Sequence, residues 1–150
     1  MRSKGNIIIC GSLVFMFFAF ALSAGAAGPV GQAVVNYADV LKANPMPAGE
    51  KAQAIKVADD ETATLFVVRF APGVEVKTHF HKTHTETLYV IEGSGETTID
   101  GKTFEIKPGT IIHIPEGKIH SAKNTGSVDL IAFQIFAPAM GEPADRVPVP

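Results

Sequence analysis

Nine short runs of residues after position 50 constrain the fold more than any other feature of the sequence. The runs are rich in Val, Ile, Thr and Phe, and each ends at Gly, Pro, Asp or Asn, a pattern typical of β-strands separated by turns. No stretch in this part of the chain keeps a helical period long enough to compete. We therefore predict strands at residues 53–58, 63–71, 76–81, 85–92, 95–100, 102–106, 110–114, 118–124 and 128–137.

Strands without a helix to cover them must bury their apolar sides by closing into a barrel or a sandwich. Asp100-Gly101 predicts a tight hairpin, because a type I′ turn needs positive φ at both central positions. At 150 residues the chain has room for one domain. We expect a single all-β domain over residues 51–137. A lead-in segment at 27–50 should add a short strand or a turn of helix, and a Pro-rich tail at 138–150 should lie over the surface or be disordered.

The first 26 residues have the layout of a secretory signal peptide. A short basic start, Arg2 and Lys4, precedes an apolar run at residues 7–22, and the small-residue pattern Ala24-Gly25-Ala26 follows. An uncleaved membrane anchor is the alternative, but sixteen apolar positions are short of the roughly 20 that span a bilayer. We expect cleavage between Ala26 and Ala27 or one residue to either side. The mature chain would then be exported, to the periplasm or alternatively outside the cell, without stable membrane association.

Composition limits the chemistry of the mature chain. Cleavage removes Cys10, the one cysteine, so neither a disulfide nor a thiolate site can form. It also leaves 11 basic and 15 acidic residues, a net charge of −4. Nucleic-acid binding requires a basic patch, so we expect no nucleic-acid partner.

The segment KTHFHKTHTETLYVIEG, residues 77–93, contains three of the five histidines. Side chains alternate along a strand, so His79 and His81 share a face. Glu86 shares a face with apolar residues, which marks that face as the inner one. Position 81 is odd and position 86 is even, so the two side chains would point to opposite faces of one continuous strand. A turn near Lys82-Thr83 must therefore shift the alternation if both are to point inward. If both strands line one interior, the three side chains converge from adjacent strands.

A fourth candidate is His120, in the segment IPEGKIHSAKN. The alternation of residues there does not decide which side of the strand faces inward. Three imidazoles and one carboxylate suit a first-row divalent ion, and six-fold coordination would leave two positions for water or substrate. We favour Fe(II) or Mn(II), with Zn, Ni, Co or Cu as alternatives; Zn usually needs only four ligands.

Two spaced motifs resemble those of the cupin family. The first is Gly73-x5-His79-x-His81-x4-Glu86-x6-Gly93, and the second is Gly109-x5-Pro115-x-Gly117-x2-His120-x3-Asn124. The resemblance implies a single jelly-roll β-barrel with a metal held inside by His79, His81, Glu86 and His120. It also implies that the glycines and Pro115 are scaffold and that the protein forms a homodimer.

No catalytic residue follows from the sequence, but three further polar residues are candidates. His84 could reach the cavity as a base or an alternative ligand, although we favour an exposed loop position. Arg69 and Gln134 lie inside apolar strands and could orient a substrate. By parity His113 should face outward, and Asn124 should be a structural hydrogen-bonding residue.

The resemblance implies a metal-dependent protein that binds a small molecule. One hypothesis is an enzyme of the dioxygenase, isomerase, decarboxylase or lyase class, acting on a small organic acid, phenolic or sugar derivative. The alternative is a non-catalytic exported cupin that binds a metal or a ligand. The ligand residues are common to these classes, so the lining of the cavity decides between them.

Overall fold

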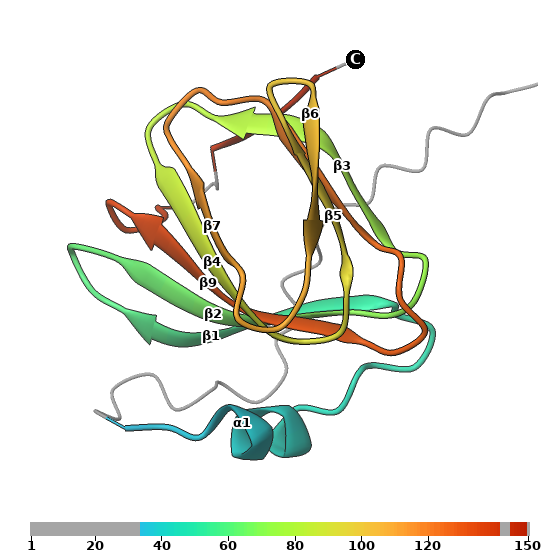
Figure 1. The fold of residues 1–150 in the computed structure, drawn as a ribbon. Coiled ribbons are helices and arrows are strands. Elements are labelled where there is room, and N and C mark those ends of the chain that lie inside the picture. Colours follow the sequence, from blue (N-terminus) through green and yellow to red (C-terminus); the bar gives the residue numbers. More distant parts are fainter. Residues whose placement is uncertain (1–33, 142–144, 150) are drawn as a thin grey trace, which may run out of the picture.

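Two five-stranded sheets face each other and enclose the interior of a barrel in the computed structural model, which describes residues 34–141 and 145–149 (Figure 1). Sheet A has the strand order β1-β2-β9-β4-β7, and sheet B has the order β10-β3-β8-β5-β6. All strand pairs are antiparallel. The strands are β1 (Ala52–Asp59), β2 (Thr64–Phe70), β3 (Glu75–His81), β4 (Thr85–Glu92), β5 (Gly95–Ile99), β6 (Lys102–Ile106), β7 (Ile111–Ile114), β8 (His120–Asn124), β9 (Leu130–Ala137) and β10 (Arg146–Pro148).

The nine predicted strands are β1 to β9, and their observed ends lie within two residues of the predicted ones. The hairpin between β5 and β6 turns as expected, since φ is 46° at Asp100 and 79° at Gly101. The all-β prediction is therefore confirmed for the barrel. The predicted signal peptide at residues 1–26 lies outside the described residues.

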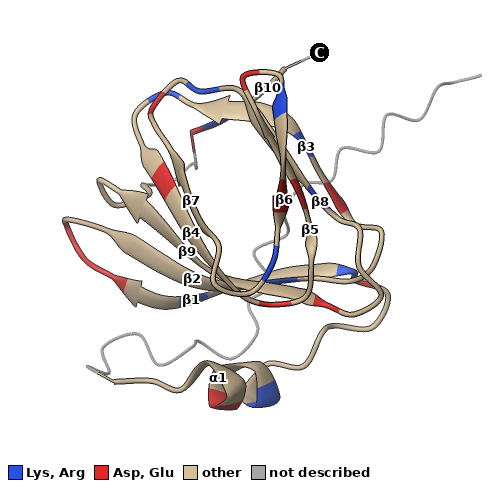
Figure 2. Ribbon diagram, in the orientation of Figure 1, with Lys and Arg blue, Asp and Glu red and all other residues tan. Residues whose placement is uncertain are grey.

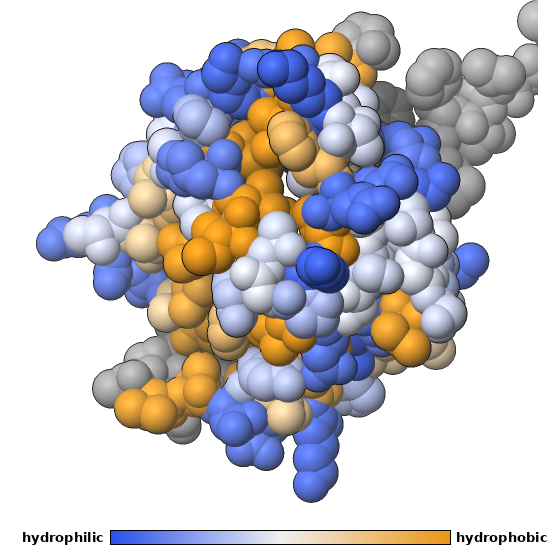
Figure 3. Space-filling model, viewed as in Figure 1, coloured by the Kyte–Doolittle hydropathy of each residue, from blue (hydrophilic) through white to orange (hydrophobic). Residues whose placement is uncertain are grey.

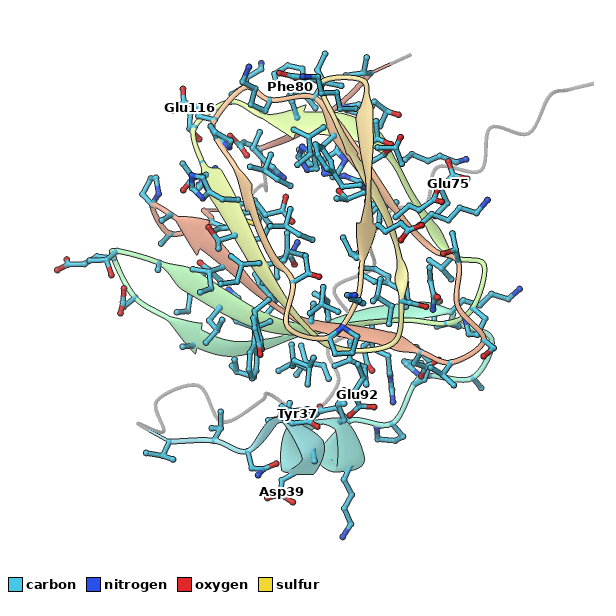
Figure 4. The ribbon with its side chains drawn as sticks, in the orientation of Figure 1. Tyr37, Asp39, Glu75, Phe80, Glu92 and Glu116 are labelled. Atoms are coloured by element: carbon cyan, nitrogen blue, oxygen red, sulfur yellow. The ribbon has the colours of Figure 1, made fainter. Side chains whose placement is uncertain are left out.

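The lead-in segment forms a helix, α1 (Tyr37–Ala43), that covers the outer face of sheet A. The Asn36 side chain caps it by accepting a hydrogen bond from the amide of Ala38 at 2.9 Å. Val40 of α1 is buried in an apolar cluster with outward-facing residues of β1, β2 and β9. The Tyr37 hydroxyl also donates to Glu92 at 2.9 Å, which ties the helix to the end of β4 (Figure 4). A second apolar layer thus lies outside the barrel.

The main core fills the space between the two sheets. Alternate residues of the strands point inward, among them Phe66, Val68 and Phe70 of β2. Acidic and basic residues are interspersed over both sheets and α1 (Figure 2). Among residues 34–141 and 145–149, no helix has the length and apolar character needed to cross a membrane.

Scaffold residues of the two motifs behave as expected. Gly93 has φ of 78°, and a side chain there would collide with the backbone carbonyl of Asp129. Asn124 is buried and donates to the carbonyls of Phe70 and Val128 at 2.8 and 2.9 Å. These contacts join the ends of β8, β2 and the loop before β9.

The C-terminal segment corrects one prediction. We expected residues 138–150 to lie over the surface or to be disordered, but Arg146–Pro148 form β10, which pairs with β3. The amide of Val149 adds a hydrogen bond to the carbonyl of Thr78 at 3.1 Å. Strand β3 would otherwise leave its backbone groups unpaired at the edge of sheet B, and an edge position tolerates Pro148.

Candidate metal centre

Four buried side chains that the sequence singled out meet inside the barrel. His79 and His81 come from β3, His120 from β8 and Glu86 from β4, and none is more than 5% exposed. One ligand atom of each lies within 4.8 Å of those of the others. The group could hold a metal ion.

Opposite sheets supply these side chains, which corrects the expectation that they come from adjacent strands. His79 and His120 are direct partners in the β3–β8 pair of sheet B. Glu86 lies on β4 in sheet A and faces them across the interior. The predicted shift of phase occurs where the chain crosses between the sheets, because β3 ends at His81 and β4 begins at Thr85.

Two of the imidazoles are fixed by backbone carbonyls two residues earlier in the chain. His79 Nδ1 lies 2.8 Å from the oxygen of Lys77, and His120 Nδ1 lies 2.9 Å from that of Lys118. A carbonyl oxygen only accepts, so each Nδ1 carries a proton and each Nε2 points to the interior. This is the tautomer that binds a metal through Nε2.

His81 is fixed in the same way by a carboxylate from the C-terminal segment. Its Nδ1 donates to Asp145 Oδ1 at 3.1 Å, across 64 positions of sequence. Asp145 Oδ2 accepts from the amide and the hydroxyl of Thr83, both at 2.7 Å. Burial would raise the pKa of Asp145, but these contacts with Thr83, His84 and His81 lower it to about 2. Asp145 is therefore an anion that orients His81.

Three buried ligand atoms lie close together without forming hydrogen bonds with one another. Glu86 Oε2 lies 3.0 Å from His120 Nε2 and 3.4 Å from His81 Nε2, yet these three buried atoms make no well-formed hydrogen bond in the described part of the chain. The other carboxylate oxygen, Oε1, accepts from Gln134 Nε2 at 2.6 Å. Buried polar atoms without partners are costly, and a cation among them would satisfy all three.

The protonation states of His79 and Glu86 suit a cation. Burial and then the charge of Arg146 lower the pKa of His79 to about 3, so its imidazole is neutral at pH 7. Burial would raise the pKa of Glu86, but contacts with His120, His81 and Gln134 hold it below its usual range. Metal ions bind neutral imidazole and ionised carboxylate, so these two residues are ready to bind.

The four residues line part of an apolar cavity of about 380 Å³. Figure 3 shows hydrophobic side chains around a hollow between the two sheets. Aromatic and aliphatic side chains from both sheets form most of its wall. Gln134, Thr97 and Arg146 are the described polar residues that line it besides the four. The cavity has the size and apolar character typical of small-molecule sites.

The three weaker candidates from the sequence have different places. Gln134 lies at the site, where it orients Glu86. Arg69 lies on the outer face of sheet A and donates to Gln53 at 2.7 Å, so it does not reach the cavity.

His84 is only 7% exposed, and the interpretation as an exposed loop residue is wrong. It does not line the cavity either. Its Nδ1 lies 2.9 Å from Asp145 Oδ1, and its Nε2 lies 3.1 Å from the oxygen of Ala139. His84 therefore holds the C-terminal segment in place.

Sequence reasoning missed two residues of the site, Asp145 and Arg146. They are adjacent opposite charges in a Pro-rich segment whose one other charged residue is Glu142. That pair of adjacent charges is the signal that could have drawn attention to them.

The Cupin domain family matches residues 66–136 of the chain. A relative from Aquifex aeolicus, an uncharacterized protein, is 31% identical over 90 residues, which cover 60% of this chain and 72% of the relative. Quercetin 2,3-dioxygenase from Bacillus subtilis is 29% identical over 105 residues, which cover 63% of this chain. The match spans only 31% of the dioxygenase, so the chain corresponds to about a third of that protein.

A solved structure from Klebsiella pneumoniae shares the fold. It is an uncharacterized conserved protein with a double-stranded β-helix domain, with a TM-score of 0.65 and 21% identity. The match covers 79% of this chain and 98% of that one. At this identity the likeness shows the fold alone.

Proposed function

The chain belongs to the cupin superfamily, and on that premise we propose that it is a metal-dependent enzyme acting on a small molecule. One observation carries the proposal. Ligand atoms of three imidazoles and a carboxylate converge in the barrel, and each ligand residue is held in place by a further hydrogen bond. A divalent ion bound there would supply Lewis-acid polarisation of an oxygen substituent, activation of dioxygen or a lowered pKa of a bound water.

His79, His81, Glu86 and His120 would hold the ion, and their neighbours have separate tasks. Gln134 and Asp145 keep Glu86 and His81 in position. The two sheets bury the ligand residues, which strengthens electrostatic interactions at the site by excluding water. Fe(II) or Mn(II) remains our proposal for the ion, with Zn, Ni, Co or Cu as alternatives, since the donor set is a mixture of nitrogen and oxygen.

The residues that line the cavity favour some of the proposed substrate classes over others. Phe66, Phe70 and Leu130 are among the apolar residues that line it. Sugar hydroxyls would find few hydrogen-bond partners there, and unpaired polar groups are costly to bury. A phenolic compound or an organic acid with an apolar body therefore fits better than a sugar. The similarity to quercetin 2,3-dioxygenase supports a dioxygenase among the four reaction classes.

A non-catalytic binding protein is the second candidate, and one observation favours it. The described residues that line the cavity include no titratable group apart from the four ligand residues and Arg146. A dedicated general acid or base is thus not evident there. Turnover would have to rely on the metal and its bound groups.

Metal content and oxygen uptake test the proposal together. Wild-type protein should retain one divalent ion in elemental analysis, whereas His79→Ala and His120→Ala should lose it and remain folded. His113→Ala is the matched control, because His113 is exposed on the outer face of β7. Unchanged metal content in the first two variants would contradict the site. Oxygen consumption with catechols and enolic acids would support the dioxygenase, and tight ligand binding without turnover would support the binding protein.

Export to the periplasm and homodimer formation stay predictions. The outer face of sheet A exposes Tyr89, Ile111 and Ile135, with exposed fractions of 45%, 71% and 39%. Size measurement of the purified protein would test the dimer.

A further inference from the structure

We propose that Arg146 binds an anionic group of the ligand, so that the cavity takes a small carboxylate with an apolar body. This inference rests on the proposed metal-dependent function and names the charge of the molecule that would bind. It depends on the place of Arg146 in the fold and on the chemistry of the guanidinium group.

Arg146 enters the cavity from β10. It is the direct partner of His81 in the β10–β3 pair, so the two side chains lie on the same, inner face of sheet B. Arg146 lines the cavity with Met140 and Pro148 of the same C-terminal segment. It is half-buried. The guanidinium is therefore part of the cavity wall.

The guanidinium lies beside the ligand residues without being one of them. Arg146 Nη2 is 3.2 Å from the oxygen of Lys77 and 3.4 Å from His79 Nδ1. His79 Nε2 faces the interior on the other side of the same ring. An anion held by Arg146 would consequently lie next to the metal ligands, where its neighbouring atoms could react.

Arg146 is the one Lys or Arg among the described residues that line the cavity, and Glu86 is the one Asp or Glu. Glu86 belongs to the proposed metal site. Among the described lining residues, Arg146 is therefore the side chain that suits an anionic part of a ligand, and most of the others are apolar.

The guanidinium group suits this task. It stays charged at any working pH, and its planar N–H donors match the two oxygens of a carboxylate. The apolar remainder of the ligand would contact the side chains of the opposite sheet. Phe66, Val90 and Ile112 of β2, β4 and β7 supply such contacts. An aromatic or short aliphatic carboxylate meets both requirements.

Calorimetric titration of the metal-loaded protein tests the inference with two probes of the same shape, benzoate and the neutral benzamide. Wild-type protein should bind benzoate at least tenfold more tightly than benzamide. Arg146→Gln should lose this preference through weaker benzoate binding, with benzamide binding and metal content unchanged, and Arg146→Lys should keep part of it. Arg69→Gln is the matched control, because that arginine lies outside the barrel, and should bind both probes as the wild type does.

The outcomes separate the inference from the proposed function. Unchanged benzoate affinity in Arg146→Gln, or no benzoate binding by metal-loaded wild-type protein, would overturn the inference. Equal loss of both probes, or loss of the metal in that variant, would also overturn it, because Arg146 would then only shape the wall. If wild-type protein binds no metal but its benzoate affinity still depends on Arg146, the proposed function fails and the inference stands.

Discussion

Replacing Asp145 with asparagine should weaken metal binding although Asp145 is not itself a proposed ligand. The carboxylate accepts a hydrogen bond from His81 Nδ1 at 3.1 Å, which fixes the ring and makes Nε2 a better donor to a metal. Asparagine has nearly the same volume, and its amide oxygen can still accept from Thr83. The substitution therefore removes mainly the negative charge.

The expected magnitude follows from the burial of the two partners. Losing such a carboxylate typically lowers metal affinity by about 10- to 100-fold. The His81 side chain is 4% exposed, but that of Asp145 is 18% exposed, so water screens part of the interaction. We expect a loss near the lower end, about tenfold or about 1.4 kcal/mol.

Competition with a chromophoric chelator measures this affinity, and thermal unfolding of the metal-free protein checks that the variant folds. Thr83→Val is the matched control, because it removes the hydroxyl contact with Asp145 Oδ2 at 2.7 Å and leaves the carboxylate in place. Its affinity should stay near the wild-type value. The reasoning is refuted if Asp145→Asn binds metal as tightly as the wild type, or if Thr83→Val loses as much.

Two further predictions concern the scaffold of the site. Gln134→Leu removes the donor to Glu86 Oε1 at 2.6 Å and should lower the free energy of unfolding of the metal-free protein by about 1–3 kcal/mol, measured by urea denaturation; an unchanged midpoint would contradict this. Gly93→Ala should destabilise the fold more than Gly101→Ala, because φ is positive at both (78° and 79°) but only at Gly93 does an added Cβ meet a backbone carbonyl. Equal losses for the two variants in the same assay would show that the collision is relieved.

Local signals account for the strands that the sequence predicted. Alternating side chains and turn residues such as Asp100-Gly101 depend only on neighbouring positions, so β1 to β9 could be placed to within two residues. Pairing between distant strands has no such signal. That β3 and β4 belong to opposite sheets therefore emerged only from the structure. The sequence left a short strand or a turn of helix open for the lead-in segment, and only the structure places a helix on the outer face of sheet A.

The candidate site likewise contains residues that the sequence predicted and residues that only the structure revealed. The spacing of two motifs pointed to His79, His81, Glu86 and His120, and the structure brings all four together. Asp145 remained hidden because its partner lies 64 positions away and because three-residue strand β10 contains a proline that suggests a loop. His84 is buried against the same distant residue, since its Nδ1 lies 2.9 Å from Asp145 Oδ1, and this contact too has no signal in the neighbouring sequence.

The position of β10 has a practical consequence for protein production. An affinity tag joined after residue 150 would begin three residues beyond Pro148, which lines the cavity. A polyhistidine tag at that end would add competing imidazoles a few residues beyond the short strand that carries Arg146. The metal content of such a fusion would include metal bound by the tag as well as metal bound in the barrel. A removable tag is therefore preferable.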